Sequence, residues 1–278
     1  MIPTGHHRSE AEIARAYDQI PEAIVMPPYF YPEVVRFAGD IAGQRVLDGG
    51  CGNGALLGLL RTGRPAELSG LELSPALCAA AQERLGGAAT IHHGSLQAPW
   101  PFPEGRFDLV VMTEVAEHLA NPWMAFGEAR RVLARDGRLI VTFPNGTAYE
   151  PFFRRAERRG GAGRWWAFLP WEHPKKTRQP IDTVYTFREI HALLAANGLV
   201  VSQMHGREAF PYLWDWMYIE RRPRLRAILQ WIEAMRPLAD RLVNRVNAHR
   251  ICYRLFIECA PSPKAGRLDA SPSQGRDR

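Results

Sequence analysis

The sequence predicts an α/β fold, a doubly wound and mostly parallel seven-stranded sheet whose last strand runs antiparallel. Two observations predict it. Between residues 45 and 143, short apolar runs alternate with segments of helical periodicity, the pattern of a parallel sheet with helices on both faces. Two further strand-like runs follow a long interruption, at residues 199–201 and 253–257. The chain has 278 residues and is 46% hydrophobic, enough for one sizeable core.

Each expected element has a local signal. A helix over residues 9–25 begins at the Ser9 cap, and a short helix over 29–38 follows Pro28. Later helices follow the glycine loop at 49–54, the caps Ser74 and Thr186, and Asn121-Pro122, the last one closing at Asp136-Gly137. The expected strands are Arg45–Leu47, Glu67–Glu72, Ala89–His92, Phe107–Met112, Arg138–Phe143, Leu199–Val201 and Tyr253–Ile257.

These elements divide the chain into three parts. Residues 1–43 form an N-terminal helical cap, residues 44–260 the main domain, and residues 261–278 a tail whose composition is typical of disorder. Insertions at 146–185 and 211–250 interrupt the main domain. In the second insertion, helical spacing runs up to Pro237 and resumes after it.

Charge and cysteine content limit the classes of function. The formal net charge is +6, and the basic residues concentrate in the two insertions, which suits an anionic substrate, nucleic acid or a membrane surface, or else simply solvated helix faces. Four cysteines without a CxxC pair favour a reduced, cytoplasmic setting. No apolar run reaches the roughly 20 residues of a membrane span, and the N-terminus has no apolar core of a signal peptide.

A glycine loop with an acid on its first position carries the strongest functional signal. Asp48-Gly49-Gly50-Cys51-Gly52-Asn53-Gly54 follows the first strand directly and precedes a helix, which makes a nucleotide-sized cradle. A carboxylate at this place would repel a pyrophosphate but suits a ligand with an amino or sulfonium group. Glu72 closes the second strand, where an acid can accept both hydroxyls of a ribose.

With this loop and these strands, the chain resembles the class I S-adenosylmethionine-dependent methyltransferases, which have a Rossmann-like fold. The resemblance covers roughly residues 44–259 and implies S-adenosylmethionine as methyl donor. The family usually has Asp where Ser95 stands, and Ser95 is a weaker acceptor for the adenine amino group, although the backbone of Leu96 could serve. The donor-binding residues that the resemblance implies are Asp48, Gly50, Cys51, Gly52, Gly54, Glu72, Leu73, Ser95, Leu96 and Thr113.

The turn after the fourth strand offers two readings of the chemistry. His118 lies just past a strand's carboxyl end, where open α/β sheets bind ligands, and could take the acceptor's proton; a histidine bonded to backbone is the alternative. Glu114, Glu117 and His118, with His173, resemble the metal cluster of small-RNA 2′-O-methyltransferases and, less fully, of ubiquinone-pathway enzymes. A Mg²⁺ ion there would hold and acidify a hydroxyl, but metal-free relatives have a similar turn.

The expected activity is methyl transfer to a small-molecule acceptor, on a hydroxyl oxygen. The basic insertions keep an RNA acceptor open, and a non-catalytic donor-binding protein or a hydride-transfer enzyme are further alternatives. Aromatic side chains at 165–171 could wall a flat or lipidic acceptor or form a small satellite core. The aromatic and basic stretch 210–226 has the make-up of a peripheral membrane element or of a packed accessory helix pair.

Overall fold

The computed structural model describes residues 10–18, 26, 29–148, 183, 185–209 and 223–262. In this part of the chain, seven strands form a single sheet of order β3-β2-β1-β4-β5-β7-β6. Strand β7 pairs antiparallel with both β5 and β6, while the other pairs are parallel. The predicted fold class, with its antiparallel last strand, is therefore confirmed. The strands are β1 (Arg45–Gly49), β2 (Glu67–Glu72), β3 (Thr90–His93), β4 (Phe107–Thr113), β5 (Leu133–Pro144), β6 (Leu199–Arg207) and β7 (Arg254–Pro261).

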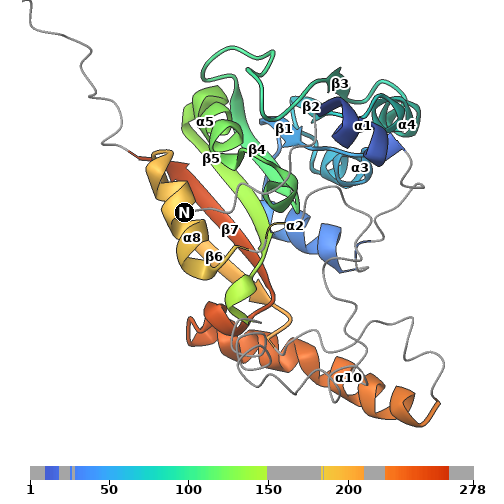
Figure 1. Cartoon of the computed structure of the whole chain (residues 1–278), viewed down its shortest axis with the longest axis vertical. Coiled ribbons are helices and arrows are strands. Elements are labelled where there is room, and N and C mark those ends of the chain that lie inside the picture. Colours follow the sequence, from blue (N-terminus) through green and yellow to red (C-terminus); the bar gives the residue numbers. More distant parts are fainter. Residues whose placement is uncertain are drawn as a thin grey trace, which may run out of the picture.

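Helices cover both faces of this sheet (Figure 1). Short 3₁₀ turns complete the described elements: η1 (Arg61–Gly63), η2 (Ala116–His118), η3 (Gly146–Ala148) and η5 (His249–Ile251). None of the helices in the described ranges has the length and apolar character needed to cross a membrane. The helices are α1 (Glu10–Asp18), α2 (Phe30–Ala38), α3 (Ala55–Leu60), α4 (Pro75–Leu85), α5 (Pro122–Val132), α8 (Phe187–Ala196) and α10 (Pro223–Arg245).

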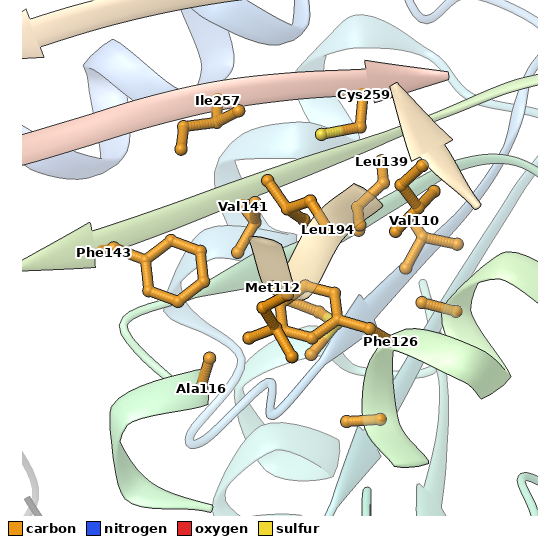
Figure 2. Close-up of a cluster of buried hydrophobic side chains, with 14 of the residues drawn as sticks. Val110, Met112, Ala116, Phe126, Leu139, Val141, Phe143, Leu194, Ile257 and Cys259 are labelled. Atoms are coloured by element: carbon orange, nitrogen blue, oxygen red, sulfur yellow. The ribbon is translucent and has the colours of Figure 1, made fainter. Parts of the chain in front are cut away.

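Burial on both faces explains the apolar run of β4. Val110 and Met112 point to one face, where they join the cluster around Phe126 of α5 and Leu194 of α8 (Figure 2). The alternating residues belong to a second cluster, which α2 and α3 cover on the opposite face. A parallel strand with two buried faces has a nearly continuous run of apolar side chains. Full burial of one such side chain stabilises the fold by about 1.5–3 kcal/mol.

Two predicted helix starts are confirmed by their caps. The Ser74 hydroxyl accepts a hydrogen bond from the Leu77 N–H at 3.1 Å, directly after Glu72. Thr186 and Glu189 form a complete capping box at the start of α8. Each cap satisfies N–H groups that the first helical turn leaves without an intrahelical partner.

Two expected boundaries were wrong. Helix α5 ends at Val132 rather than at Asp136-Gly137, because Leu133 already pairs with Phe107 of β4 and begins β5. Pro237 lies inside α10 and does not divide it. The residues after Pro237 are bonded to the sheet through Asp240 and Asn244, and these tertiary bonds offset the backbone bond that a proline removes. Most of the first insertion, residues 211–222 of the second and the tail beyond Ser262 lie outside the described residues.

Candidate active site

The candidate site lies along the edge of the sheet where the parallel strands end. Glu72 ends β2, Asp48 lies near the end of β1, Glu114 follows β4, and Glu208 follows β6. Because β7 runs antiparallel, its first residue, Arg254, lies at this same edge, between Pro144 of β5 and Arg207 of β6. Ionisable groups from five strands are thus collected on one side of the sheet.

The glycine loop has no side chain at Gly50, Gly52 and Gly54 to cover its backbone. Gly50, Gly52 and Gly54 have φ values of 81°, 52° and 74°, in the left-handed region that strongly favours glycine. A Cβ on Gly50 would lie 2.7 Å from a methyl group of Val115. Residue 50 must therefore be glycine for two independent reasons, and the loop can approach a ligand closely.

Glu72 is bonded to this loop. Its side chain is buried, with Oε2 accepting from the Gly52 N–H at 2.9 Å and Oε1 from the Ser74 N–H at 2.8 Å. Burial raises the pKa of Glu72, and these backbone N–H groups oppose the rise. A carboxylate oxygen has two lone pairs, so each oxygen keeps acceptor capacity for a ligand hydroxyl. Helix α1 contacts the same turn through its last residue, Asp18, which accepts a hydrogen bond from the Ser74 hydroxyl at 2.5 Å.

Asp48 is the least compensated charge of the site. It is 1% exposed, and its Oδ1 has no hydrogen-bond partner in the described structure. Burial, together with the negative charge of Glu72, raises its pKa to about 7. Neither acid forms an ion pair with a lysine or arginine of the described residues. A buried carboxylate in this state is complemented by a ligand cation.

Ser95 and Leu96 follow β3 on the far side of the loop. The Ser95 hydroxyl accepts a hydrogen bond from the Gln97 N–H at 2.9 Å, which shapes the turn. Leu96 is buried, and its carbonyl accepts from the indole N–H of Trp100 at 3.2 Å. A methyl group of Leu96 would lie 3.3 Å from a Cβ on Gly49, so this side chain packs against the beginning of the loop. The Leu73 carbonyl contacts Nε2 of His93 at 3.0 Å.

The turn after β4 separates residues that the sequence had grouped together. Glu114 has a left-handed φ of 49° and turns toward β5. Its N–H donates to the Thr142 hydroxyl at 2.9 Å, and this hydroxyl donates to its Oε1 at 2.9 Å. Its Oε2 pairs with Arg254 at 3.3 Å. Thr113 ends β4 opposite Thr142.

His118 and Glu117 stay together in η2. The two side chains are largely buried, with 3.8 Å between Nε2 of His118 and Oε1 of Glu117. The described members of the expected metal cluster do not fit a divalent ion, because Glu114 is committed to Arg254, and no group of three or more metal-ligating side chains occurs in the described ranges. His173, the fourth expected ligand, lies outside the described residues.

Arg254 is a site residue that sequence reasoning missed. It is 7% exposed, and its guanidinium lies 4.9 Å from the Phe30 ring centroid. Burial alone would lower its pKa, but the combined effect of its acidic neighbours, Glu114 and Glu208 foremost and then Tyr29 and Tyr253, raises it. Glu208 also accepts a hydrogen bond from the Tyr29 hydroxyl. In the sequence Arg254 is one arginine among many, and no local signal marks it.

Tyr31 of α2 was missed as well. Burial raises its pKa to about 12, with Asp48 and Glu114 acting in the same direction and Arg84 against them. Its phenol therefore lies within electrostatic reach of both the glycine loop and the β4 turn. The aromatic triplet Tyr29-Phe30-Tyr31 after Pro28 was the signal that could have identified it.

Comparison with known proteins supports the resemblance. A family model described as a methyltransferase domain matches residues 47–141. The demethylmenaquinone methyltransferase of Tropheryma whipplei is 29% identical over 149 residues, which are 51% of this chain and 62% of that protein. The chloroplastic tocopherol O-methyltransferase of Arabidopsis thaliana is 33% identical over 119 residues, which cover 39% of this chain and 34% of that protein. The malonyl-[acyl-carrier protein] O-methyltransferase of Geobacter sulfurreducens is 36% identical over 117 residues, which cover 41% of this chain and 44% of that protein.

Solved structures share the fold at low identity. Magnesium protoporphyrin IX methyltransferase from Synechocystis PCC 6803, with bound SAH, has a TM-score of 0.52 at 15% identity, covering 91% of this chain and 86% of that one. The cyclase SpnF has a TM-score of 0.54 at 15% identity, covering 83% and 80%. The resemblance to class I S-adenosylmethionine-dependent methyltransferases is thus confirmed in family model and fold. The chain spans less than two thirds of the length of these curated relatives.

Proposed function

We propose that this chain is an S-adenosylmethionine-dependent methyltransferase that transfers a methyl group to a hydroxyl oxygen of a small-molecule acceptor. The observation that carries the proposal is the pair of buried acids, Asp48 and Glu72, on adjacent strand ends beside a glycine loop. Two buried carboxylates that form no ion pair with a lysine or arginine of the described residues fit a donor that carries a sulfonium and an amino group. Asp48, at the start of the loop, does not fit a pyrophosphate, which argues against a dinucleotide cofactor.

Each donor-binding role follows from the contacts described above. The Glu72 carboxylate, fixed by two backbone N–H groups, would accept both ribose hydroxyls. The unpartnered Oδ1 of Asp48 would accept from the amino group and attract the sulfonium. The bare backbone at Gly50 and Gly52 gives the donor room. These residues fit S-adenosylmethionine, whose net positive charge offsets part of the acidic pair.

The donor supplies a methyl group that its sulfonium has already activated. The acceptor oxygen attacks the methyl carbon while the carbon–sulfur bond breaks, and that electron pair stays on sulfur. The acceptor's hydroxyl proton passes to the imidazole of His118. Histidine is the side chain that most often acts as a general base, and His118 lies in the turn after β4 with little exposure. The protein's main task is alignment of oxygen, carbon and sulfur in a dry site.

Two comparisons support oxygen as the acceptor atom, because the tocopherol and malonyl-[acyl-carrier protein] relatives are named as O-methyltransferases. The acceptor would lie between the phenol of Tyr31, the Glu114–Arg254 pair and His118. There the charges are compensated internally, since Glu114 is paired. A neutral acceptor with a hydroxyl group suits this surrounding better than a strongly charged one.

Calorimetric titration with S-adenosylmethionine and with NAD tests the donor. Glu72→Gln keeps the side-chain shape but removes the charge, and should weaken binding by about 10–150-fold, the equivalent of about 1.5–3 kcal/mol. Glu83→Gln, an exposed acid of α4, is the matched control and should bind normally. Unchanged affinity in Glu72→Gln, or preference for NAD, contradicts the assignment. Incubation with isotopically labelled donor and a cell extract, followed by mass spectrometry, then identifies the acceptor.

A further inference from the structure

The outward face of α10 is apolar although it is exposed. Five of the eight exposed large apolar side chains in the described residues lie within Met235–Ile251. The outer face consists of Met235, Leu238, Leu242, Val246 and Ile251, whose exposed fractions are 41%, 59%, 62%, 62% and 52%. Met235, Leu238 and Leu242 of α10, with Val246 directly after its last residue, follow helical spacing and form one stripe. Single exposed apolar residues need no explanation, but a contiguous patch marks an interaction surface.

The exposed charged residues within 234–251, where the structure describes the side chains, are all arginines. Arg241 and Arg245 of α10 are exposed, as is Arg250 of η5, whose guanidinium lies 5.2 Å from the Phe187 ring centroid. The acid of this segment, Asp240, is 1% exposed on the inward side, where it contacts Arg207 at 3.5 Å. The outer face thus combines an apolar stripe with uncompensated positive charge.

The inward side of α10 is bonded to the sheet, so the apolar stripe cannot turn inward. Asp240 accepts from the Ala209 N–H at 2.9 Å. The Asn244 amide bonds both the N–H and the carbonyl of Gly206, at 2.7 and 2.8 Å. Asn145, at the end of β5, donates to the Arg250 and Cys252 carbonyls and holds η5. Figure 1 shows α10 at the periphery of the molecule, beside the end of β6.

We propose that the outer face of α10 binds the surface of an anionic lipid bilayer. A helix that lies in the membrane interface needs apolar side chains to enter the acyl boundary and basic side chains to meet the headgroups. The outer face has both. A second copy of this chain is a poorer partner, because two-fold pairing of this face would bring arginines together without a carboxylate to compensate them. The surface is separate from the donor site, and the proposal does not depend on methyl transfer.

Vesicle co-sedimentation with the full chain tests the proposal. The protein should sediment with vesicles of phosphatidylcholine mixed with phosphatidylglycerol, and much less with phosphatidylcholine alone. Arg241→Gln with Arg245→Gln should weaken binding by roughly thirtyfold, since each basic residue near an anionic surface contributes about 1 kcal/mol. The control is Arg61→Gln with Arg135→Gln, which removes the same charge from exposed positions elsewhere and should bind nearly as the parent does.

The apolar stripe is tested separately. Leu238→Gln with Leu242→Gln should weaken vesicle binding by more than about tenfold, whereas Val200→Gln, at a similarly exposed apolar residue of β6, should not. All replaced side chains are exposed, so thermal unfolding should be unchanged. No sedimentation with anionic vesicles, or equal sedimentation of stripe and control variants, overturns the proposal. A concentration-dependent dimer that the stripe variant loses would also overturn it, because the face would then be a protein interface.

Discussion

Donor binding should depend on pH through Asp48. Burial, together with the negative charge of Glu72, raises the pKa of Asp48 to about 7 in the ligand-free protein. A cationic donor binds the ionised carboxylate in preference to the protonated acid. Donor affinity should therefore be constant well above pH 7 and fall as the pH decreases through this value. An ordinary aspartate, with a pKa of 3.8, would give no such dependence in this range.

The size of the effect follows from the fraction of ionised Asp48. One unit below the pKa, about one site in eleven is ionised, so the apparent association constant should fall about tenfold. The association constant stops falling at the pH below which most of the donor binds to the protonated form of Asp48. A charge-assisted hydrogen bond contributes about 1.5–3 kcal/mol, so the protonated form should bind about 10–150-fold more weakly. Asp48→Asn should show this weak affinity at every pH.

Calorimetry between about pH 6 and pH 8 measures both the affinity and the protons released, the latter from buffers of different ionisation enthalpy. Near the pKa, binding to the parent protein should release about half a proton, and binding to Asp48→Asn should release less. The variant's profile also corrects for titration of Glu72 and of the donor's amino group. A flat profile for the parent, or the same slope in the variant, would refute the role assigned to the unpartnered carboxylate.

Three further predictions concern stability and turnover. The pKa of Asp48 is higher in the folded chain than in the unfolded chain, so the ligand-free protein should lose stability as the pH rises from about 4 to about 7. Above pH 7, Asp48→Asn should recover up to about 4 kcal/mol of the free energy of unfolding, measured with denaturant. His118→Gln should lower kcat by about 10²–10⁴-fold with donor Kd unchanged, and normal turnover would make His118 structural. Tyr31→Phe should weaken donor or acceptor binding about 2–12-fold, read as Kd or KM, without changing the fold.

The donor half of the site could be predicted because its signals are local. The loop, Asp48 and Glu72 lie within one strand–helix–strand unit, and the Gly52–Glu72 bond joins its two ends. Gly50, Gly52 and Gly54 have left-handed backbone conformations that other residues adopt only with strain, which explains why glycine stands at these positions. The fold class was predictable for a similar reason, since a parallel strand buried on both faces has a nearly continuous apolar run, as Leu109–Met112 of β4 does.

The other half of the edge depends on pairs that are distant in sequence. Glu114 meets Arg254 only because β7 inserts between β5 and β6 and runs antiparallel. The sequence grouped Glu114 with Glu117 and His118 as possible metal ligands, but its left-handed backbone turns it toward β5 and Arg254. The end of α5 was misplaced for a related reason, because pairing of Leu133 with Phe107 overrides the local turn signal at Asp136-Gly137.

Substitutions in the donor-binding part of the site and in its acceptor-binding part should therefore affect different kinetic constants. Methyl transfer removes the positive charge of the donor, so the carboxylates of Asp48 and Glu72 interact with the substrate at least as strongly as with the transition state. Such interactions increase affinity without accelerating the chemical step, and they weaken as the neutral product forms, which favours its release. In the proposed reaction, acceleration must come from the acceptor side, through proton removal by His118 and alignment between Tyr31 and the Glu114–Arg254 pair. Substitutions in the donor half should then change Kd, and substitutions in the acceptor half should change kcat.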